Sequence, residues 1–387
     1  MSQPALRSPS IVVALIVGLL SAGCGKATPD VPYAAPEVTA DGLATGEPAD
    51  YGVRMNSIAD LIERIRSGGY VNIHSLLVLR KDTLVVEEYF PGLSDGGVDV
   101  VYDRDTLHTL RSVTKSVNAI LIGIAVDQGL IRSVDDPIAA YLPEYADVFA
   151  DPGKRAIRVR DLLSMTAGLQ WDEWSVPYSD PRNDIALLNA APDPVRYVLE
   201  RPLVAEPGRV FVYSSGVSDT LGLILQRATG LRPDLFAEQH LFSQLAIAQY
   251  YWSRYPNGFV RTNGGLYLRP RDMAKIGLLY LNGGSWGQQR VVSEHWVAEC
   301  TRAQAPEFSD TYVRGYGFQW WLDRFSPPGR SPVTGFSGRG RGGQFVFVVP
   351  DTDLVVVFTG WNDNALERQA YEMMERYVLP AIDQSFR

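Results

Sequence analysis

The chain has 387 residues, of which 46% are hydrophobic and 21% are charged. It is therefore long and apolar enough to bury a core as one large domain or two smaller ones, and wholesale disorder is excluded. The formal net charge of −8 at pH 7 makes nucleic acid a poor partner, because phosphate backbones attract basic surfaces.

The first predicted element is an apolar run at residues 11–20, which lies between Arg7 and Cys24. The run is too short to cross a bilayer, which takes about 20 residues, and its length fits the apolar region of a signal peptide. Small residues before Cys24 resemble a bacterial lipoprotein cleavage site, so residues 1–23 are predicted to be a lipoprotein-type signal peptide. Plain secretion and a buried N-terminal helix are the alternatives.

A lipidated Cys24 would anchor an exported protein in the bacterial envelope or periplasm, and this lipid would be its only contact with a membrane. Without lipidation the chain is expected to be secreted. Residues 24–50 are rich in Pro, Ala, Gly and Asp and are predicted to be a linker. Cys300 would then be the single thiol of the exported domain at residues 51–387, which excludes an internal disulfide.

The exported domain begins with a helix and a hairpin. Apolar residues at helical spacing predict a helix over residues 57–67. Two short apolar runs, Ser75–Leu79 and Thr83–Tyr89, are separated by three polar residues and predict a hairpin. A strongly apolar stretch then predicts a helix over Val113–Asp127, with Gly129 as its C-terminal stop.

Helical patterns continue through the middle of the chain, and are clearest at Ser218–Ala228 and Pro270–Leu281. Toward the end, the apolar runs Gln344–Val349 and Leu354–Thr359 flank a polar turn and predict a second hairpin. The mixed charges of Ala365–Tyr377 predict a terminal helix.

Strand signals therefore lie at both ends of the domain and helices lie between them. The simplest assembly is an α/β (α+β) fold, in which an antiparallel sheet flanked by helices carries a mostly helical part. Residues 51–111 and about 282–387 would form the sheet-containing part, and about 112–281 the helical part. A site is expected at the seam between them, where ligand clefts are favoured.

Ser112 and Lys115 are the first candidate site residues. They are one helical turn apart at the start of the predicted helix, so their side chains share a face. A serine hydroxyl needs a base beside it, and a lysine serves once burial lowers its pKa from about 10.4 toward about 7–8. The alternative is an N-cap serine followed by a solvated lysine. This lysine is the only one of five that follows a serine by three residues.

Tyr213 is the second candidate, because it follows a short extended run and precedes a small-residue loop and a helix. A phenol beside a cationic lysine can pass protons to a leaving group. The alternative is a core tyrosine with a satisfied hydroxyl.

Residues 338–344 (GRGRGGQ) match the pattern G-x-G-x-x-G. An apolar strand run follows them where a dinucleotide site needs a helix, which excludes the nucleotide interpretation. Glycines before an edge strand allow close approach of backbone to a ligand, so a backbone N–H here is expected in an oxyanion hole. Arg339 and Arg341 would attract a carboxylate or lie in solvent as turn residues.

These three segments, in this order, resemble the serine β-lactamase-like hydrolases. That family includes class C β-lactamases, D-alanyl-D-alanine carboxypeptidases, family VIII esterases and 6-aminohexanoate-dimer hydrolases. S-V-T-K at residues 112–115 matches the family's S-x-x-K, and Y-S-S at 213–215 stands where many members have Y-x-N. The stretches VRDLLSMTAGL (159–169), LGLILQRATG (221–230), GGLYLRPRDMAKIGLLYL (264–281) and GYGFQWW (315–321) are also similar to the family. The resemblance implies a β-lactamase/transpeptidase-like fold.

The resemblance also implies roles. Ser112 would be the acylated nucleophile, Lys115 its base and Tyr213 a proton relay, and the backbone N–H groups of Ser112 and Arg341 would form the oxyanion hole. The residues expected to contact substrate are Trp171, Ser215, Arg339 and Gly340. No cofactor or metal is implied, and the partner would be a small ester or amide.

Two departures from the family pattern argue against antibiotic degradation. Ser215 replaces the asparagine that contacts the β-lactam amide, and the third motif has no Lys or His. Segments 171–174 and 178–183 look most like the aminohexanoate-dimer hydrolase branch, and their aromatics would line an acyl pocket or pack in surface loops. The alternatives are an envelope D-alanyl-D-alanine carboxypeptidase, a weak β-lactamase, and a catalytically silent envelope-binding protein on the same fold.

Other catalytic patterns are missing from the sequence. It contains neither a G-x-S-x-G elbow nor H-E-x-x-H. The four histidines are dispersed along the chain, and no two of them have metal-ligand spacing.

Overall fold

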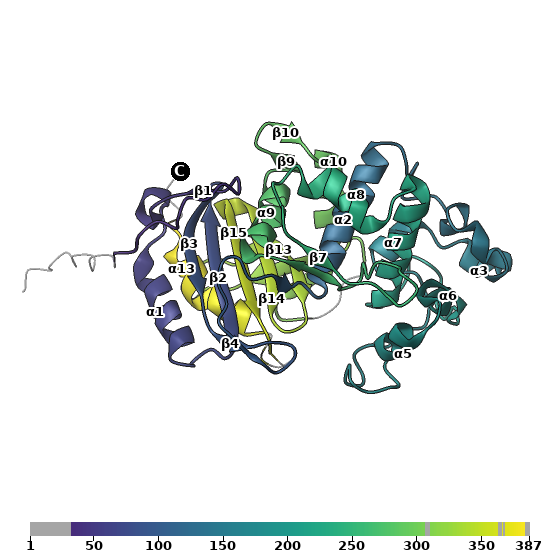
Figure 1. Cartoon of the computed structure of the whole chain (residues 1–387), viewed down its shortest axis with the longest axis horizontal. Helices are drawn as coiled ribbons and strands as arrows, with labels where there is room; N and C mark the ends of the chain where they lie inside the picture. Colours follow the sequence, from purple (N-terminus) through teal and green to yellow (C-terminus); the bar gives the residue numbers. More distant parts are fainter. Residues whose placement is uncertain (1–31, 306–309, 363–365, 367, 384–387) are drawn as a thin grey trace, which may run out of the picture. The chain divides into compact units, whose positions relative to one another are not determined.

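An eight-stranded sheet organises the part of the chain that the computed structural model describes, residues 32–305, 310–362, 366 and 368–383. The strand order β1-β3-β2-β15-β14-β13-β12-β11 puts N-terminal strands beside C-terminal ones (Figure 1). Every pairing is antiparallel except that of β1 with β3. The strands are β1 (Ala44–Thr45), β2 (Ile73–Arg80), β3 (Thr83–Tyr89), β11 (Val313–Tyr316), β12 (Trp321–Phe325), β13 (Val333–Gly340), β14 (Gln344–Val349) and β15 (Leu354–Gly360).

The centre of the sheet is covered on both faces. Every residue of β2, β14 and β15 is buried, which explains why these strands are continuous apolar runs in the sequence. The predicted hairpins are confirmed as β2–β3 and β14–β15. They also pair with each other, because β2 lies beside β15 with Val78 opposite Val356.

Helices from both ends of the chain cover one face of the sheet. α1 (Met55–Arg66), α12 (Gln369–Met373) and α13 (Leu379–Ala381) pack there in a single apolar cluster. α12 lies within the terminal helix predicted at 365–377, and the chain changes geometry at the π-helical turn Met374–Val378.

The other face is covered by α9 (Pro270–Leu281), which packs on β14 and β15 (Figure 1). The prediction that placed residues 270–281 with the helical part is therefore wrong. Gly277 explains this position, because a Cβ there would lie 2.5 Å from Val355 Cγ1, so only a glycine allows the helix so close to the sheet.

The mostly helical part is built around α2 (Val113–Asp127) and α7 (Ser215–Thr229), which pack on each other. Thirteen consecutive residues of α2, Val113–Ala125, are buried, so this helix lies inside the protein. Further α-helices in the described residues are α3 (Pro152–Arg155), α4 (Val159–Leu163), α5 (Asp184–Ala190), α6 (Pro194–Glu200), α8 (Pro233–Ala237) and α10 (Glu294–Thr301). The fold class expected from the sequence is confirmed.

Short strands form smaller sheets in the described residues. β6 (His108–Thr109) and β7 (Tyr251–Trp252) both pair with β8 (Leu266–Leu268), which brings the residues before Ser112 beside the loop that precedes β8. Two further pairs are β4 (Gly92–Leu93) with β5 (Asp99–Val100), and β9 (Ser285–Trp286) with β10 (Gln289–Arg290).

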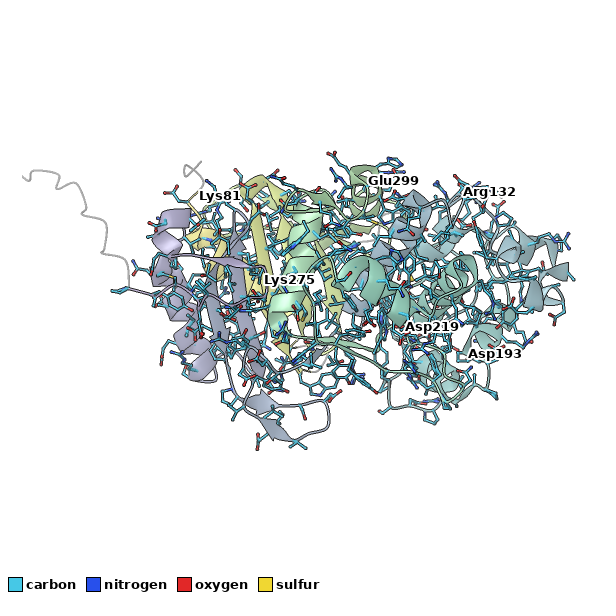
Figure 2. The ribbon with its side chains drawn as sticks, turned by 45° about the horizontal axis from the view of Figure 1, so that its top comes forward. Lys81, Arg132, Asp193, Asp219, Lys275 and Glu299 are labelled. Atoms are coloured by element: carbon cyan, nitrogen blue, oxygen red, sulfur yellow. The ribbon has the colours of Figure 1, made fainter. Side chains whose placement is uncertain are left out.

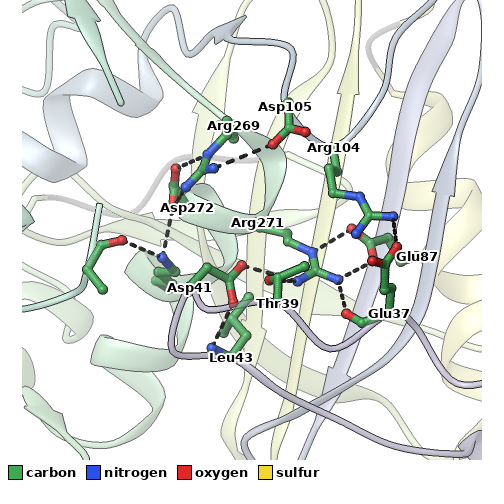
Figure 3. A network of polar contacts seen from close by, with 12 residues as sticks. Glu37, Thr39, Asp41, Leu43, Glu87, Arg104, Asp105, Arg269, Arg271 and Asp272 are labelled. Atoms are coloured by element: carbon green, nitrogen blue, oxygen red, sulfur yellow. Dashed lines mark hydrogen bonds and ion pairs between the residues drawn. The ribbon is translucent and has the colours of Figure 1, made fainter. Parts of the chain in front are cut away.

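The segment predicted as a linker is fixed on the domain over residues 37–50, so that prediction is wrong there. β1 pairs with β3, and Arg271 of α9 binds the same segment (Figure 3). The Arg271 guanidinium donates to the Glu37 carbonyl at 2.8 Å and to Thr39 Oγ1 at 2.6 Å, and contacts Asp41 at 3.2 Å. It also donates to both carboxylate oxygens of Glu87 on β3, at 2.7 and 2.6 Å. Arg271 holds this segment by polar contacts, which leave no apolar periodicity in the sequence. The composition of residues 24–50 therefore indicated a linker.

The predicted signal peptide, Cys24 and the first part of the linker lie outside the described residues, and remain predictions. Within the described residues, none of the helices is both long and apolar enough to span a bilayer.

Candidate active site

Ser112 lies at the junction of a short strand and a buried helix. The chain leaves β6, turns at Arg111 and enters α2 directly after Ser112. Arg111 has a φ of 46°, a left-handed conformation that is strained for a bulky side chain. The Val113 N–H closes this turn by donating to the Leu110 carbonyl at 3.1 Å. The turn leaves Ser112 half-buried at the start of the helix, with its side chain lining a cavity.

Lys115 is one turn further along α2 and is buried, with 1% of its surface exposed. Its Nζ lies 2.8 Å from Ser112 Oγ, 3.1 Å from Ser215 Oγ and 2.6 Å from the Asn263 carbonyl oxygen. Burial lowers the pKa of Lys115 to about 8, and the nearby carboxylates of Glu173 and Asp219 oppose the fall. At neutral pH this site therefore holds a lysine that gives up its proton far more readily than a solvated one.

Tyr213 lies just before α7 and faces the same amine. Its ring centroid is 5.1 Å from Lys115 Nζ. The ring stacks on both Trp174 and Trp321, with centroid separations of 5.0 and 5.5 Å, and the two indoles also stack on each other at 6.5 Å. Tyr213 and Ser112 line the same cavity, so the structure brings together the three side chains for which the sequence predicts catalytic roles.

Ser215 is the first residue of α7 and contacts the amine directly. The Ser214 side chain caps this helix, which fixes the position of Ser215. Ser215 Oγ lies between Lys115 and Glu173, and donates to Glu173 Oε1 at 3.0 Å. Glu173 is 2% exposed and was not singled out from the sequence. The Asn263 carbonyl was missed too, since no sequence pattern marks a backbone oxygen 148 residues from its partner.

Gly338 and Gly340 of the third motif lie in β13, which the sequence did not predict as a strand, and Gly342 and Gly343 lie in the turn that follows. A Cβ at Gly338 would lie 3.1 Å from Ser116 Oγ, and one at Gly340 would lie 2.2 Å from the Leu110 carbonyl oxygen. Both glycines therefore let β13 lie against the start of α2. The following strand, β14, is inside the sheet between β13 and β15, so the expected edge strand is wrong.

Two cavities meet at Ser112. The larger has a volume of about 470 Å³ and the smaller about 250 Å³, and Ser112, Tyr178 and Arg341 line both. The larger cavity has mainly aromatic walls and is also lined by Trp174, Phe211, Tyr213, Asp310, Val313, Trp321, Arg339, Gly340, Phe345 and Arg368. The smaller cavity is mainly polar and is also lined by Arg111, Ile185, Asn189, Ser215, Ser253, Arg261, Asn263, Gly264, Gly265 and Tyr267.

Most residues expected to contact substrate line these cavities, but Trp171 does not. Trp171 is buried in the apolar core, and its indole N–H donates to Glu173 Oε2 at 2.7 Å. A Cβ at Gly216 would lie 2.9 Å from its ring, so the indole packs directly under α7. Trp174, which is 60% exposed, lines the larger cavity in its place.

Three arginines line the larger cavity. Arg339 is half-buried, with its guanidinium 4.8 Å from the centre of the Trp321 ring. Arg341 is exposed in the turn after β13 and lies 4.7 Å from the centre of the Tyr178 ring. Arg368 forms an ion pair with Asp310 at 2.9 Å. The cavity thus combines aromatic walls with positive charge.

Two of the histidines that are dispersed in the sequence meet in the structure. His74 Nδ1 and His108 Nε2 lie 2.8 Å apart, and burial lowers the pKa of His74 to about 3 and that of His108 to about 4. Both are therefore neutral at pH 7. Among the described residues, no group of three or more His, Cys, Asp or Glu side chains is arranged to hold a metal ion.

Comparison with known proteins finds matches over most of the chain. The family model described as Beta-lactamase matches residues 59–371. The 6-aminohexanoate-dimer hydrolase of Paenarthrobacter ureafaciens is 28% identical over 350 residues, which cover 82% of this chain and 80% of the relative.

Solved structures show the same fold. A penicillin-binding protein homologue from Caulobacter crescentus superposes with a TM-score of 0.64 at 17% identity, and covers 84% of this chain and 97% of its own. A family VIII carboxylesterase superposes with a TM-score of 0.60 at 21% identity, and the match covers 82% of this chain and 96% of the carboxylesterase. These identities are low, so the two structures support the fold alone.

Proposed function

This chain belongs to the Beta-lactamase family and is a serine hydrolase acting on amides or esters, and we propose that it works through an acyl-enzyme on Ser112. The observation that carries the proposal is the 2.8 Å contact between Ser112 Oγ and the buried Lys115 Nζ. A hydroxyl within hydrogen-bond reach of an amine with a lowered pKa is the arrangement that nucleophilic catalysis requires.

In the proposed acylation step, neutral Lys115 takes the Ser112 hydroxyl proton while Ser112 Oγ bonds to the substrate carbonyl carbon. The carbonyl electron pair moves onto its oxygen, which the N–H groups of Ser112 and Arg341 are proposed to stabilise. The tetrahedral intermediate then expels the amine or alcohol, and Tyr213 relays the proton that the leaving group needs. Water attacks the resulting ester, with Lys115 again as the base, and releases the acid and free Ser112.

The substrate is proposed to be a small ester or amide, including short amide oligomers and peptides. The two cavities support a molecule that is apolar or aromatic on one side of the scissile bond and polar on the other. Arg339 and Arg341 favour an anionic group such as a carboxylate on that molecule. Ser215 stands where the lactamase pattern has an asparagine, and the third motif at residues 338–344 has no lysine or histidine. Both departures favour esters and linear amides over β-lactams.

A fluorophosphonate probe tests the nucleophile. Wild-type protein is expected to gain one covalent label on the peptide that contains Ser112, and Ser112→Ala is expected to gain none. A label that survives this substitution would exclude Ser112.

Activity on p-nitrophenyl esters, short amide oligomers and nitrocefin then distinguishes substrates. Stable penicillin acylation of Ser112 would instead favour a carboxypeptidase.

Gly340→Ala is expected to lower kcat/KM for ester hydrolysis by about 10- to 100-fold, the scale of a 1 Å misplacement at an active site. The added Cβ would lie 2.2 Å from the Leu110 carbonyl, so β13 must move away from the turn that holds Ser112. Gly96→Ala is the matched control, because its Cβ would meet only Ser94 Oγ at 3.8 Å, and its kinetics should equal wild type. Equal kinetics for Gly340→Ala would contradict the close packing of β13.

A further inference from the structure

Glu173 is a buried carboxylate that the proposed reaction does not use. Its Oε1 accepts from the Ser215 hydroxyl at 3.0 Å and from the Tyr178 hydroxyl at 3.2 Å. Its Oε2 accepts from the Trp171 indole N–H at 2.7 Å and from the Ser215 backbone N–H at 2.8 Å. A buried carboxylate is costly unless such bonds satisfy it, so four donors arranged around one side chain call for an explanation.

The hydrogen of the Ser215 hydroxyl has a fixed direction. A serine carries a single hydroxyl hydrogen, and that of Ser215 goes to Glu173 Oε1. Ser215 Oγ can therefore only accept from Lys115 Nζ, which lies 3.1 Å away. The Asn263 carbonyl, 2.6 Å from the same nitrogen, can also only accept.

These two acceptors decide where the lysine lone pair points. A neutral amine has two hydrogens and one lone pair, and Ser215 and Asn263 take both hydrogens. The lone pair is left for the third neighbour, Ser112 Oγ, at 2.8 Å. We propose that Glu173 is a positioning residue that acts through Ser215 to aim the lone pair of Lys115 at Ser112. This inference rests on the proposed role of Lys115 as the base.

The proton balance of acylation is consistent with this role. When Ser112 gives its proton to Lys115, the amine becomes an ammonium with three hydrogens, which donate to Ser112 Oγ, Ser215 Oγ and the Asn263 carbonyl. The carboxylates of Glu173 and of Asp219 on α7 both favour the ammonium form of Lys115. The third titratable group that faces the amine is Tyr213.

Glu173→Gln tests the proposal because its amide can fit in one orientation. The Trp171 and Ser215 N–H donors require an oxygen at the Oε2 position, so the amide nitrogen must face the Ser215 hydroxyl. Ser215 then accepts from the amide, and its hydrogen turns toward the Lys115 lone pair in competition with Ser112. The limiting kcat/KM at high pH is expected to fall at least about tenfold, a share of the contribution of a general base.

The pH profile separates positioning from a structural role. Activity requires neutral Lys115, so kcat/KM rises with pH through the pKa of this lysine. Glu173→Gln removes a negative charge that favours the ammonium, so the rise is expected to move to lower pH by roughly one unit. Ser215→Ala keeps the charge and loses one hydrogen-bond acceptor for the amine, so its rise is expected to move less than that of Glu173→Gln while its limiting rate falls. A change that only loosened the fold would lower the rate without moving the rise.

The double variant Glu173→Gln/Ser215→Ala tests the route of the effect. Because Glu173 acts through Ser215, the limiting rate of the double variant is expected to be no lower than that of Ser215→Ala alone. Multiplied losses, or a Glu173→Gln profile that superimposes on wild type, would overturn the inference. If Glu173→Gln does not fold, Glu173→Asp replaces it as the test. The shorter aspartate side chain keeps the negative charge but does not reach the Ser215 hydroxyl. A wild-type limiting rate for Glu173→Asp would then overturn the inference.

The two proposals fail in different ways. If fluorophosphonate does not label Ser112 in the wild-type protein, the proposed function fails. If Ser112 is labelled and Lys115→Met is inactive, but the profile of Glu173→Gln equals wild type, only the positioning role fails.

Discussion

Replacing Lys115 by methionine is expected to lower kcat/KM about 10³-fold, within the usual range for loss of a general base. Methionine has a similar length and fills the buried site, but has no lone pair that can take the Ser112 proton. The wild-type rate is expected to rise with pH around the Lys115 pKa of about 8, because the neutral amine is the active form. The residual rate of the variant should lack this rise. Initial rates across pH 6–10 measure both effects.

Lys115→Met is also expected not to lower the melting temperature at pH 7. Burial depresses the pKa of Lys115 in the folded protein, so the buried ammonium opposes folding below about pH 8 and methionine removes that cost. Lys275 of α9 is the matched control (Figure 2). It is also fully buried, but pairs with Asp272 at 2.8 Å over the sheet. Lys275→Met is expected to be less stable than wild type and to keep its activity per folded molecule. If Lys115→Met is active, Lys115 is excluded as the base.

Arg271→Met is expected to lower the free energy of unfolding by about 3–5 kcal/mol, the usual cost of removing one partner from a buried ion pair. Side-chain exposure is 3% for Arg271, 7% for Glu87 and 9% for Asp41, so the substitution strands two carboxylates away from water. It also releases the segment that carries Glu37 and Thr39 (Figure 3). Urea unfolding at pH 7 measures the change.

Arg209→Met is the matched control for charge removal. Its ion pair with Glu206 has side-chain exposures of 73% and 76%, and exposed pairs contribute less than about 1 kcal/mol. A similarly small change for Arg271→Met would show that the network in Figure 3 does not hold the N-terminal segment on the sheet.

Elements with a strong apolar pattern were predictable from the sequence. The helix at Val113–Asp127, the helix at Pro270–Leu281 and the strand at Thr83–Tyr89 have the predicted bounds. β13 was missed because its residues Gly338–Gly340 lack an apolar run, and it is extended because β12 and β14 pair with it on either side. Likewise, the partner of α9 depended on how closely Gly277 lets it approach β15, which no periodicity encodes.

The candidate site was predictable where residues are close in sequence. Ser112 and Lys115 share one helical turn, so helix geometry alone brought them together. Glu173 reaches the amine through Ser215, 42 residues away, and only the packing of the intervening loop on α7 creates that contact. The same loop decides that Trp171 faces the core and Trp174 the cavity, because adjacent turns point side chains in directions that spacing does not determine.

The pairing of β2 with β15 has a consequence for synthesis of the protein. β2 leaves the ribosome long before its neighbour, and the central sheet cannot close until the last strand has emerged. α2, which begins directly after Ser112, rests on β13, another strand that is synthesised late, so its packing surface is also absent from a partly made chain. A chain cut short before β13 lacks this surface and is expected to be inactive.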